Sequence, residues 1–119
     1  MPVFVQFQVG QMKYFKGKLQ KVRGSPIMLS VHPDITASDI LEQAVDKHRA
    51  CDCTLPRSVY KLLYPDGQPV EFVPGTVDSF TLLKYKNFIG KAYQKLVLYI
   101  CTEEDYLAGI FLLNYNGCG

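Results

Sequence analysis

Thr81-Leu82-Leu83-Lys84-Tyr85 is the stretch on which the predicted fold depends. Thr81 is a favourable N-cap residue, and Gly90 is a favourable residue for closing a helix at its carboxyl end. The stretch therefore predicts a short helical turn over residues 82–89. Residues 95–101 then predict the last core strand, whose side chains divide between two faces: Leu96, Leu98 and Ile100 on one, and Val97, Tyr99 and Cys101 on the other.

A longer helix is predicted earlier in the chain, at about residues 36–50. Thr36 stands at the cap position and Asp39 follows three residues later, which is close to the capping-box pattern. Ile35 before the cap can pack on Ile40, as in a hydrophobic staple. Apolar residues after Ile40 then recur at helical spacing, so one face of this helix is predicted to be buried.

Four further runs predict strands, over residues 3–9, 27–31, 59–64 and 70–73. The first two alternate cleanly, and prolines or Pro-Gly turns end the others. Residues 12–22 mix aromatic residues with lysines and have no clear alternation. They fit either the tip of a long hairpin or an extra ribbon, because weakly patterned strands do not specify a register.

Length and composition indicate one globular domain with a real core. The chain has 119 residues, of which 48% are hydrophobic and 20% charged. The first residues do not form a signal peptide, and no apolar run approaches the ~18 residues of a membrane span. We therefore expect an intracellular protein, cytoplasmic or nuclear, with no membrane partner.

The four cysteines, Cys51, Cys53, Cys101 and Cys118, are expected to be reduced in such a compartment. Cys51 and Cys53 have no second cysteine pair or paired histidine nearby, so the zinc signal is weak. We predict no metal and no cofactor.

Three stretches, in this order, resemble the ubiquitin-like β-grasp family. They are Val3-Phe4-Val5, the run Leu29-Ser30-Val31-His32-Pro33-Asp34-Ile35-Thr36, and Thr81-Leu82-Leu83-Lys84-Tyr85. The resemblance spans residues 3–101. It implies an α+β fold in which a mixed four- to five-stranded sheet packs on one main helix, at about 36–50, with a short capped helical turn at about 82–89.

Two turn-rich stretches extend the resemblance, and two features depart from it. Leu63-Tyr64-Pro65-Asp66-Gly67 and Pro74-Gly75-Thr76 more distantly resemble ubiquitin-like domains found beside HECT-type ligase modules. The hairpin between the first two strands is longer than that of ubiquitin. The last residues, Asn116-Gly117-Cys118-Gly119, contain no paired glycines, so conjugation to other proteins is not expected.

We divide the chain into a β-grasp domain, residues 1–102, and a C-terminal extension, residues 103–119. The extension contains an apolar run at residues 107–115. An apolar run of this kind needs burial. It is expected either to pack on the domain, for example as a strand added to a sheet edge, or to be the start of a truncated element.

A sheet covered by a helix on one face leaves the other face open. We expect Leu29, Val31, Leu62, Leu96 and Leu98 to face the helix. The opposite set then contains the predicted partner-binding residues Phe4, Leu63, Val97 and Tyr99. The resemblance carries the partner-binding role of ubiquitin's apolar face onto Leu63 and Tyr99. The alternative is that residues 107–115 cover this face.

The second candidate surface is basic and consists of Lys13, Lys16, Lys18, Lys21 and Arg23. It fits the basic half of a Phox/Bem-type domain, which would self-associate electrostatically. The acidic half of that pattern is sparse, since residues 64–71 contain only Asp66 and Glu71. The lysines form no nucleic-acid reading motif, so a nucleic-acid partner is disfavoured.

No residue pattern indicates catalysis. A hydrolase needs a nucleophile with a base in reach. His32 stands beside a strand-ending proline, and His48 is interpreted as a boundary residue near the helix end. We therefore predict a non-catalytic ubiquitin-like protein–protein interaction domain, in the ubiquitin pathway or as an adaptor module of a larger protein, with protein partners and self-association as the alternative.

Overall fold

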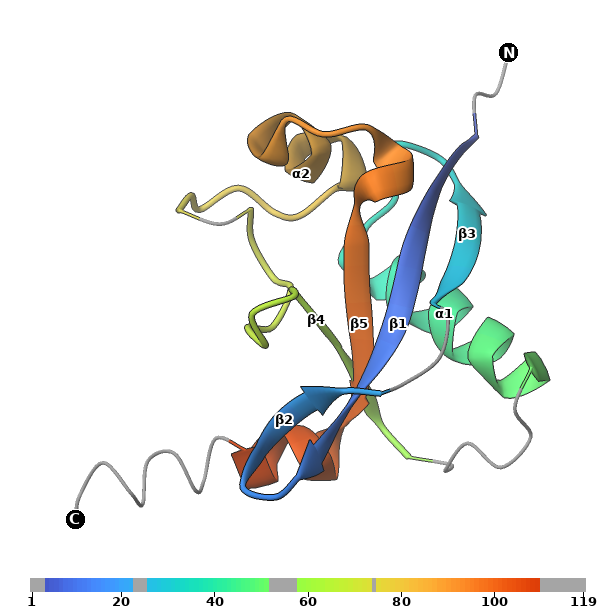
Figure 1. The fold of residues 1–119 in the computed structure, drawn as a ribbon. Coiled ribbons are helices and arrows are strands. Elements are labelled where there is room, and N and C mark those ends of the chain that lie inside the picture. The colour runs from blue at the N-terminus through green and yellow to red at the C-terminus, as the bar shows by residue number, and fades with distance from the viewer. Residues whose placement is uncertain (1–3, 23–25, 52–57, 74, 110–119) are drawn as a thin grey trace.

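The computed structural model describes residues 4–22, 26–51, 58–73 and 75–109, without the side chain of Cys51 (Figure 1). Within these ranges the fold is α+β and β-grasp-like, with five strands in a mixed sheet and one main helix. The elements are β1 (Val5–Phe15), β2 (Lys18–Lys21), β3 (Ile27–Val31), α1 (Ala37–Cys51), β4 (Tyr60–Leu63), α2 (Leu82–Ile89), the 3₁₀ turn η1 (Tyr93–Lys95) and β5 (Val97–Thr102).

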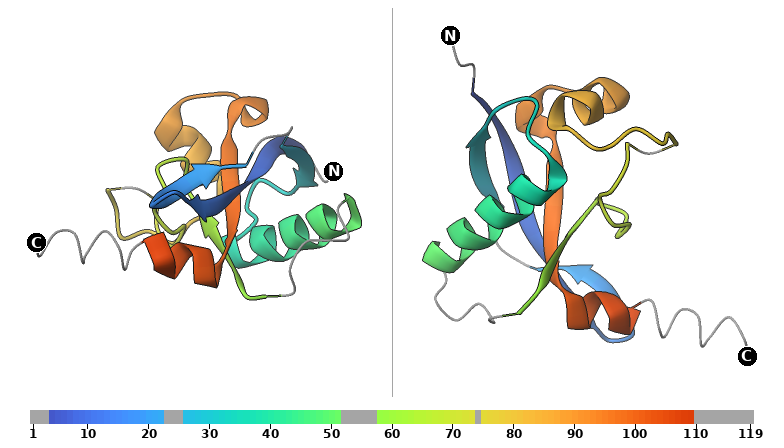
Figure 2. Two further views of the ribbon diagram at one scale, coloured as in Figure 1. Left: turned by 60° about the horizontal axis from the view of Figure 1, so that its bottom comes forward. Right: turned by 180° about the vertical axis from the view of Figure 1, so that it is seen from behind.

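Strand β1 is the centre of the sheet. Its first half pairs antiparallel with β3, and its second half pairs antiparallel with β2. Residues 8–11 in the middle of β1 pair in parallel with β5, and β5 in turn pairs antiparallel with β4. Gln8 of β1 lies opposite both Met28 and Val97, so three strands meet side by side at this level. Helix α1 crosses one face of the sheet (Figure 2, right).

Both predicted helix starts are confirmed. The backbone N–H of Asp39 donates to Thr36 Oγ1 at 3.4 Å, and the N–H of Lys84 donates to Thr81 Oγ1 at 3.3 Å. Gly90 ends α2 with φ 76°, a conformation that glycine adopts without strain. Local capping chemistry therefore places both helices where the sequence predicted them.

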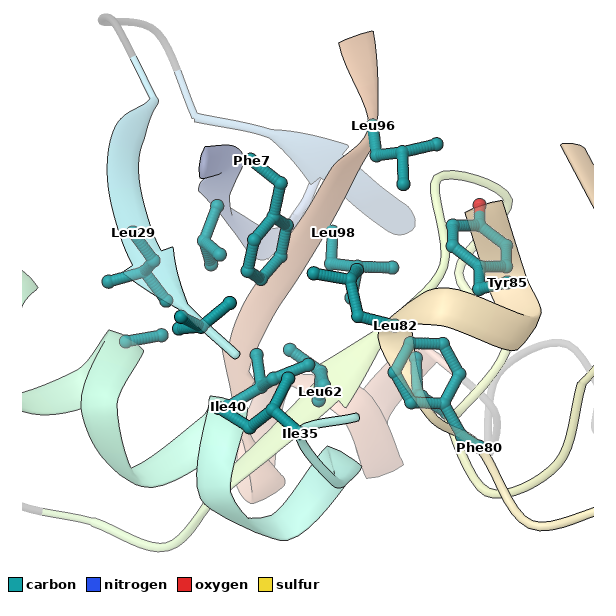
Figure 3. Close-up of a cluster of buried hydrophobic side chains, with 14 of the residues drawn as sticks. Phe7, Leu29, Ile35, Ile40, Leu62, Phe80, Leu82, Tyr85, Leu96 and Leu98 are labelled. Atoms are coloured by element: carbon teal, nitrogen blue, oxygen red, sulfur yellow. The ribbon is translucent and has the colours of Figure 1, made fainter. Parts of the chain in front are cut away.

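The main core lies between the sheet and the two helices (Figure 3). Phe7 of β1, Ile40 of α1, Leu82 of α2 and Leu98 of β5 are all completely buried there. The backbone N–H of Leu82 also donates to Ile35 O at 3.3 Å. The stretch before the last strand therefore packs its leucine into the core and bonds to the entrance of α1.

His48 is buried, at 5% exposure, and is not the boundary residue that the sequence suggested. Its Nε2–H donates to Val9 O at 2.9 Å, which leaves Nδ1 to accept from Gln11 Nε2 at 3.1 Å. Burial lowers the pKa of His48 below its ordinary value, although the bond to Val9 acts in the opposite direction. A neutral imidazole therefore bridges α1 and β1.

Residues 12–22 form a hairpin, because β1 continues to Phe15 and β2 returns along it. The predicted strand at 70–73 was wrong. Single bridges join Leu63 to Pro69 and Phe72 to Ser79, and the described part of this segment contains no strand. Pro69 has no N–H to donate, so it cannot continue a ladder along β4.

Residues 103–109 form a further helix directly after β5 (Figure 1). Thr102 caps it, since Thr102 Oγ1 accepts from the backbone N–H of Asp105 at 3.2 Å. A Cβ added at Gly109 would lie 3.1 Å from Leu19 Cγ, so this helix packs closely on β2. Residues 110–119 lie outside the described ranges, and so does most of the apolar run 107–115. Within the described ranges, no helix is long and apolar enough to cross a membrane.

Candidate functional site

The sheet face opposite α1 is the predicted binding face. The expected division of side chains between the two faces is confirmed on the α1 side. The residues expected to face the helix are all in the main core, with exposed fractions of 5% or less: Leu29, Val31, Leu62, Leu96 and Leu98. The opposite face divides into two halves that differ in what covers them.

One half is covered, and it contains Leu63. Leu63 is 0% exposed and forms a second buried cluster with Met12 and Cys101. Leu19 from the hairpin and Tyr106 from the 103–109 helix pack against this cluster, together with Tyr99. The prediction that Leu63 is an exposed binding residue was therefore wrong. The predicted side of the sheet was correct for Leu63, but the hairpin and the helix after β5 both pack over this half of the face.

Tyr99 lies at the margin of the covered half and is partly exposed. It pairs with Gly10, and a Cβ added at Gly10 would lie 2.9 Å from Tyr99 Cε1. Lys21 Nζ lies 5.3 Å from the centre of the Tyr99 ring on the hairpin side. The ring thus packs on Gly10 and contacts a cation, so Tyr99 has a structural role in joining β5 to the hairpin.

The described cysteine in this half, Cys101, is free and buried. Burial, with a contribution from the nearby charge of Asp105, raises the pKa of its thiol to about 12. The thiolate is the nucleophilic and metal-binding form of cysteine, so Cys101 is suited to packing. Among the described residues, no cluster of histidine, cysteine and acidic side chains could hold a metal ion.

The other half is open, and we call it the open sheet surface. It is made by alternate residues of three neighbouring strands and their ends. Phe4 is 61% exposed and Met28 36% exposed, while Val97 is partly buried. Its members are Phe4, Gln6 and Gln8 on the β1 side, Met28, Ser30 and His32 on the β3 side, and Val97 on β5.

Strand register makes the open sheet surface continuous. Met28, Gln8 and Val97 form one row across three strands, and Ser30 and Gln6 form the next. Phe4 then meets the His32 ring edge to face, with 5.3 Å between ring centres. The rows place apolar side chains beside amide and hydroxyl groups, which suits a protein partner.

The edge of this surface is held by two interactions. The Nζ of Lys47, on α1, donates to the Met28 carbonyl at 2.7 Å and so occupies one acceptor on the outer edge of β3. The Nε2 of Gln8 donates to Gln94 O at 2.8 Å, which ties the middle of the surface to η1. His32 Nδ1 lies 3.5 Å from Asp34 Oδ1 at the rim. The rows themselves contain no lysine, arginine or acidic residue.

The basic surface lies on the hairpin. Lys13, Lys16, Lys18 and Lys21 are exposed, and Arg23 lies outside the described ranges. Among the described side chains these lysines make no ion pair, although Lys16 lies over the ring of Phe15, 5.4 Å from its centre. Phe15 is 58% exposed near the hairpin tip. The surface is therefore cationic, with one exposed aromatic ring.

The predicted binding residues are thus divided between the two halves. Phe4 and Val97 lie on the open sheet surface, whereas Leu63 and Tyr99 belong to the covered half. The sequence interpretation did not include Met28 among the binding residues. Because Met28 is next to Leu29 in the strand alternation and Leu29 faces the helix, Met28 was already predicted to lie on the open face. The chain matches no protein-family model, and no curated protein matches it.

Proposed function

We propose that this chain is a non-catalytic protein-binding domain of the ubiquitin-like type, which acts as an adaptor through its open sheet surface. The observation that carries the proposal is a continuous and uncharged row of side chains, in which Met28 is exposed and Gln8 and Val97 are partly exposed, with the exposed Phe4 beyond it.

The chemistry of the surface favours a protein partner over other ligands. Burying Phe4 and Met28 in an interface removes apolar area from water. Gln6 and Gln8 supply amide donors and acceptors that can satisfy polar groups of a partner at the rim. Helix α1 and the core hold the strands from behind, so the surface is formed before binding and little ordering is required. Placement in the ubiquitin pathway rests on the family resemblance.

The test compares affinity capture by the wild type with capture by the double variant Phe4→Ala/Val97→Ala. A control is Val77→Ala, because Val77 is 90% exposed and belongs to none of the five strands. We expect a partner that binds the wild type and the control but not the double variant. The proposal fails if every captured protein is retained by all three.

The second candidate is electrostatic self-association. It is favoured by the exposed hairpin lysines, which have no ion pair among the described residues, and by Asp66 and Glu71, which have none there either. Sedimentation at low salt should then show association that Lys16→Glu/Lys18→Glu abolishes and that salt weakens. A monomer at high protein concentration and low salt would eliminate this candidate.

A further inference from the structure

A groove of about 620 Å³ lies between α2 and residues 64–73 and 75–76, and it shares no described lining residue with the open sheet surface. Tyr64 and Tyr85 line it with rings that are tilted by 38° to each other and whose centres are 5.1 Å apart; both side chains are largely buried, at 6% and 5% exposure. Phe72 on one wall and Phe88 on α2 are 49% and 54% exposed. We call it the aromatic groove: two exposed phenylalanine rings and the small accessible parts of two buried tyrosine rings line one concave surface.

The charge of the aromatic groove is negative. Asp66 and Glu71 line it, and no lysine, arginine or histidine is among its described lining residues. Burial is the main cause that raises the pKa values of Tyr64 and Tyr85; the Tyr85 hydroxyl adds to the rise at Tyr64, and the negative charge of Asp66 adds to it at both. Neither acid has an ion-pair partner among the described side chains. Asp66 also lines a neighbouring pocket with Lys18 and Lys21, and Glu71 lines another with Lys61, so these lysines lie near the acids but outside the described lining of the groove.

Hydrogen bonds fix the geometry of the groove. The hydroxyl of Tyr64 donates to Phe72 O at 2.6 Å, which joins the floor to one wall. Asp66 Oδ1 accepts from the backbone N–H of Gln68 at 3.0 Å, which sets the direction of the carboxylate. On the other wall, Figure 3 shows the hydroxyl of Tyr85 pointing away from Leu82 and Phe80. The groove is thus formed before any ligand binds, which lowers the entropic cost of binding.

We propose that the aromatic groove binds an arginine or lysine side chain presented by an extended segment of a partner protein. The methylene groups of such a side chain would pack against the rings of Phe72 and Phe88. Its cationic head would meet the negative faces of the aromatic rings and the carboxylate of Asp66, and these attractions add in a partly enclosed site.

Charge complementarity selects this occupant. A phosphorylated or acidic segment would be repelled by Asp66 and Glu71. A neutral apolar segment would remove water from both carboxylates without supplying a counter-charge, which is costly. The inference is independent of the open sheet surface, because the two sites share no residue.

The experiment uses two short synthetic peptides, acetyl-Ala-Arg-Leu-Arg-Ala-amide and the same peptide with citrulline in place of arginine. Citrulline has nearly the shape of arginine but no charge. Titration into the whole chain is followed by NMR of Tyr85, Phe88 and Ile89. We expect saturable shifts of these residues with the arginine peptide and binding at least about 10-fold weaker with the citrulline peptide. Absence of shifts with the arginine peptide, or equal affinities, would overturn the inference.

Matched variants locate the site. Phe88→Ala should weaken arginine-peptide binding about 10-fold, whereas Leu83→Ala should not change it, because Leu83 lies on the same helix outside the groove and is 44% exposed. Asp66→Asn should weaken binding several-fold, and Asp78→Asn should not. Equal effects within either pair overturn the assignment. Shifts of the groove residues that depend on protein concentration without peptide would show that a second copy occupies the groove, and would also overturn it.

Discussion

The two halves of the sheet face opposite α1 show the same alternation of side chains, but one half is exposed to solvent and the other is buried. Met28 and Val97 point outward from β3 and β5 on an open surface, whereas Met12 and Leu63 point to the same side and are buried. The difference comes from the hairpin and the 103–109 helix, which lie at one end of the sheet only (Figure 2). Strand periodicity therefore fixes the side to which a residue points, but elements elsewhere in the chain decide whether that side meets water.

The comparison separates structural residues from recognition residues. The covered half holds a small apolar cluster that joins the sheet to the hairpin and the last helix. The open half has no described element packed over it. We therefore expect substitutions in the first half to change stability, and substitutions in the second half to change binding.

The largest effect is expected for Leu63→Ala. Leu63 is 0% exposed, so truncation leaves a cavity and should lower the free energy of unfolding by about 2–5 kcal/mol. Urea unfolding followed by circular dichroism measures this change. Val97→Ala on the open half is the matched control, with an expected loss of less than about 1.5 kcal/mol because that side chain is only partly buried. Equal losses for the two variants would remove the distinction between the halves.

Gly10→Ala should have the next largest effect, because the new Cβ would lie 2.9 Å from Tyr99 Cε1. Overpacking of this kind lowers the free energy of unfolding by about 1–3 kcal/mol. Thermal unfolding measures the loss, with Gln6→Ala, an exposed residue on the same strand, as the control. On a Tyr99→Leu background the cost should shrink. An unchanged cost on that background would mean that the Tyr99 ring is not the obstacle.

Lower pH should destabilise the protein through His48. The fold lowers the pKa of His48 below its ordinary 6.5, so the unfolded chain binds the proton more readily. The stabilising contribution is complete above that pH, and it is lost as the pH falls from 6.5 through the lower pKa of the folded state. Urea midpoints between about pH 8 and about pH 5 measure this loss. His48→Gln should make the urea midpoint less dependent on pH, and His32→Gln should not. If only His32→Gln reduced the pH dependence, the effect would be assigned to His32.

The smallest effect on stability is expected for Phe4→Ala. Phe4 is 61% exposed, and its described ring contact is with His32 at the rim. The free energy of unfolding should change by no more than about 0.5 kcal/mol, as for other surface substitutions. The same urea assay measures it. A loss similar to that of Leu63→Ala would place Phe4 in a packed cluster and contradict the open half.

Local chemistry made much of the fold predictable. Thr36 and Thr81 each cap a helix with a hydroxyl that accepts a backbone N–H three residues later, and the sequence displays both signals directly. The side to which each strand residue points was also predictable from alternation. These features depend on neighbours within a few residues, so a single sequence contains the information.

The burial of Leu63 could not be predicted in the same way. It depends on Leu19 and Tyr106, which lie more than 40 residues away along the chain on either side. One missed signal was local: Thr102 with Asp105 is a helix start of the same kind as Thr36 with Asp39. Recognising it would have predicted a helix after β5, but its packing on the hairpin is a tertiary contact that no local pattern specifies.

Methionine oxidation tests the difference between the halves most directly. Met28 and Met12 lie on the same side of the sheet, but Met28 is 36% exposed and Met12 is 5% exposed. Exposed thioethers react with dilute hydrogen peroxide faster than buried ones, and peptide mass spectrometry distinguishes the two sites. In the folded protein Met28 should be oxidised well before Met12, and in urea their rates should converge. Equal rates in the folded protein, or faster oxidation of Met12, would contradict the covered and open halves described above.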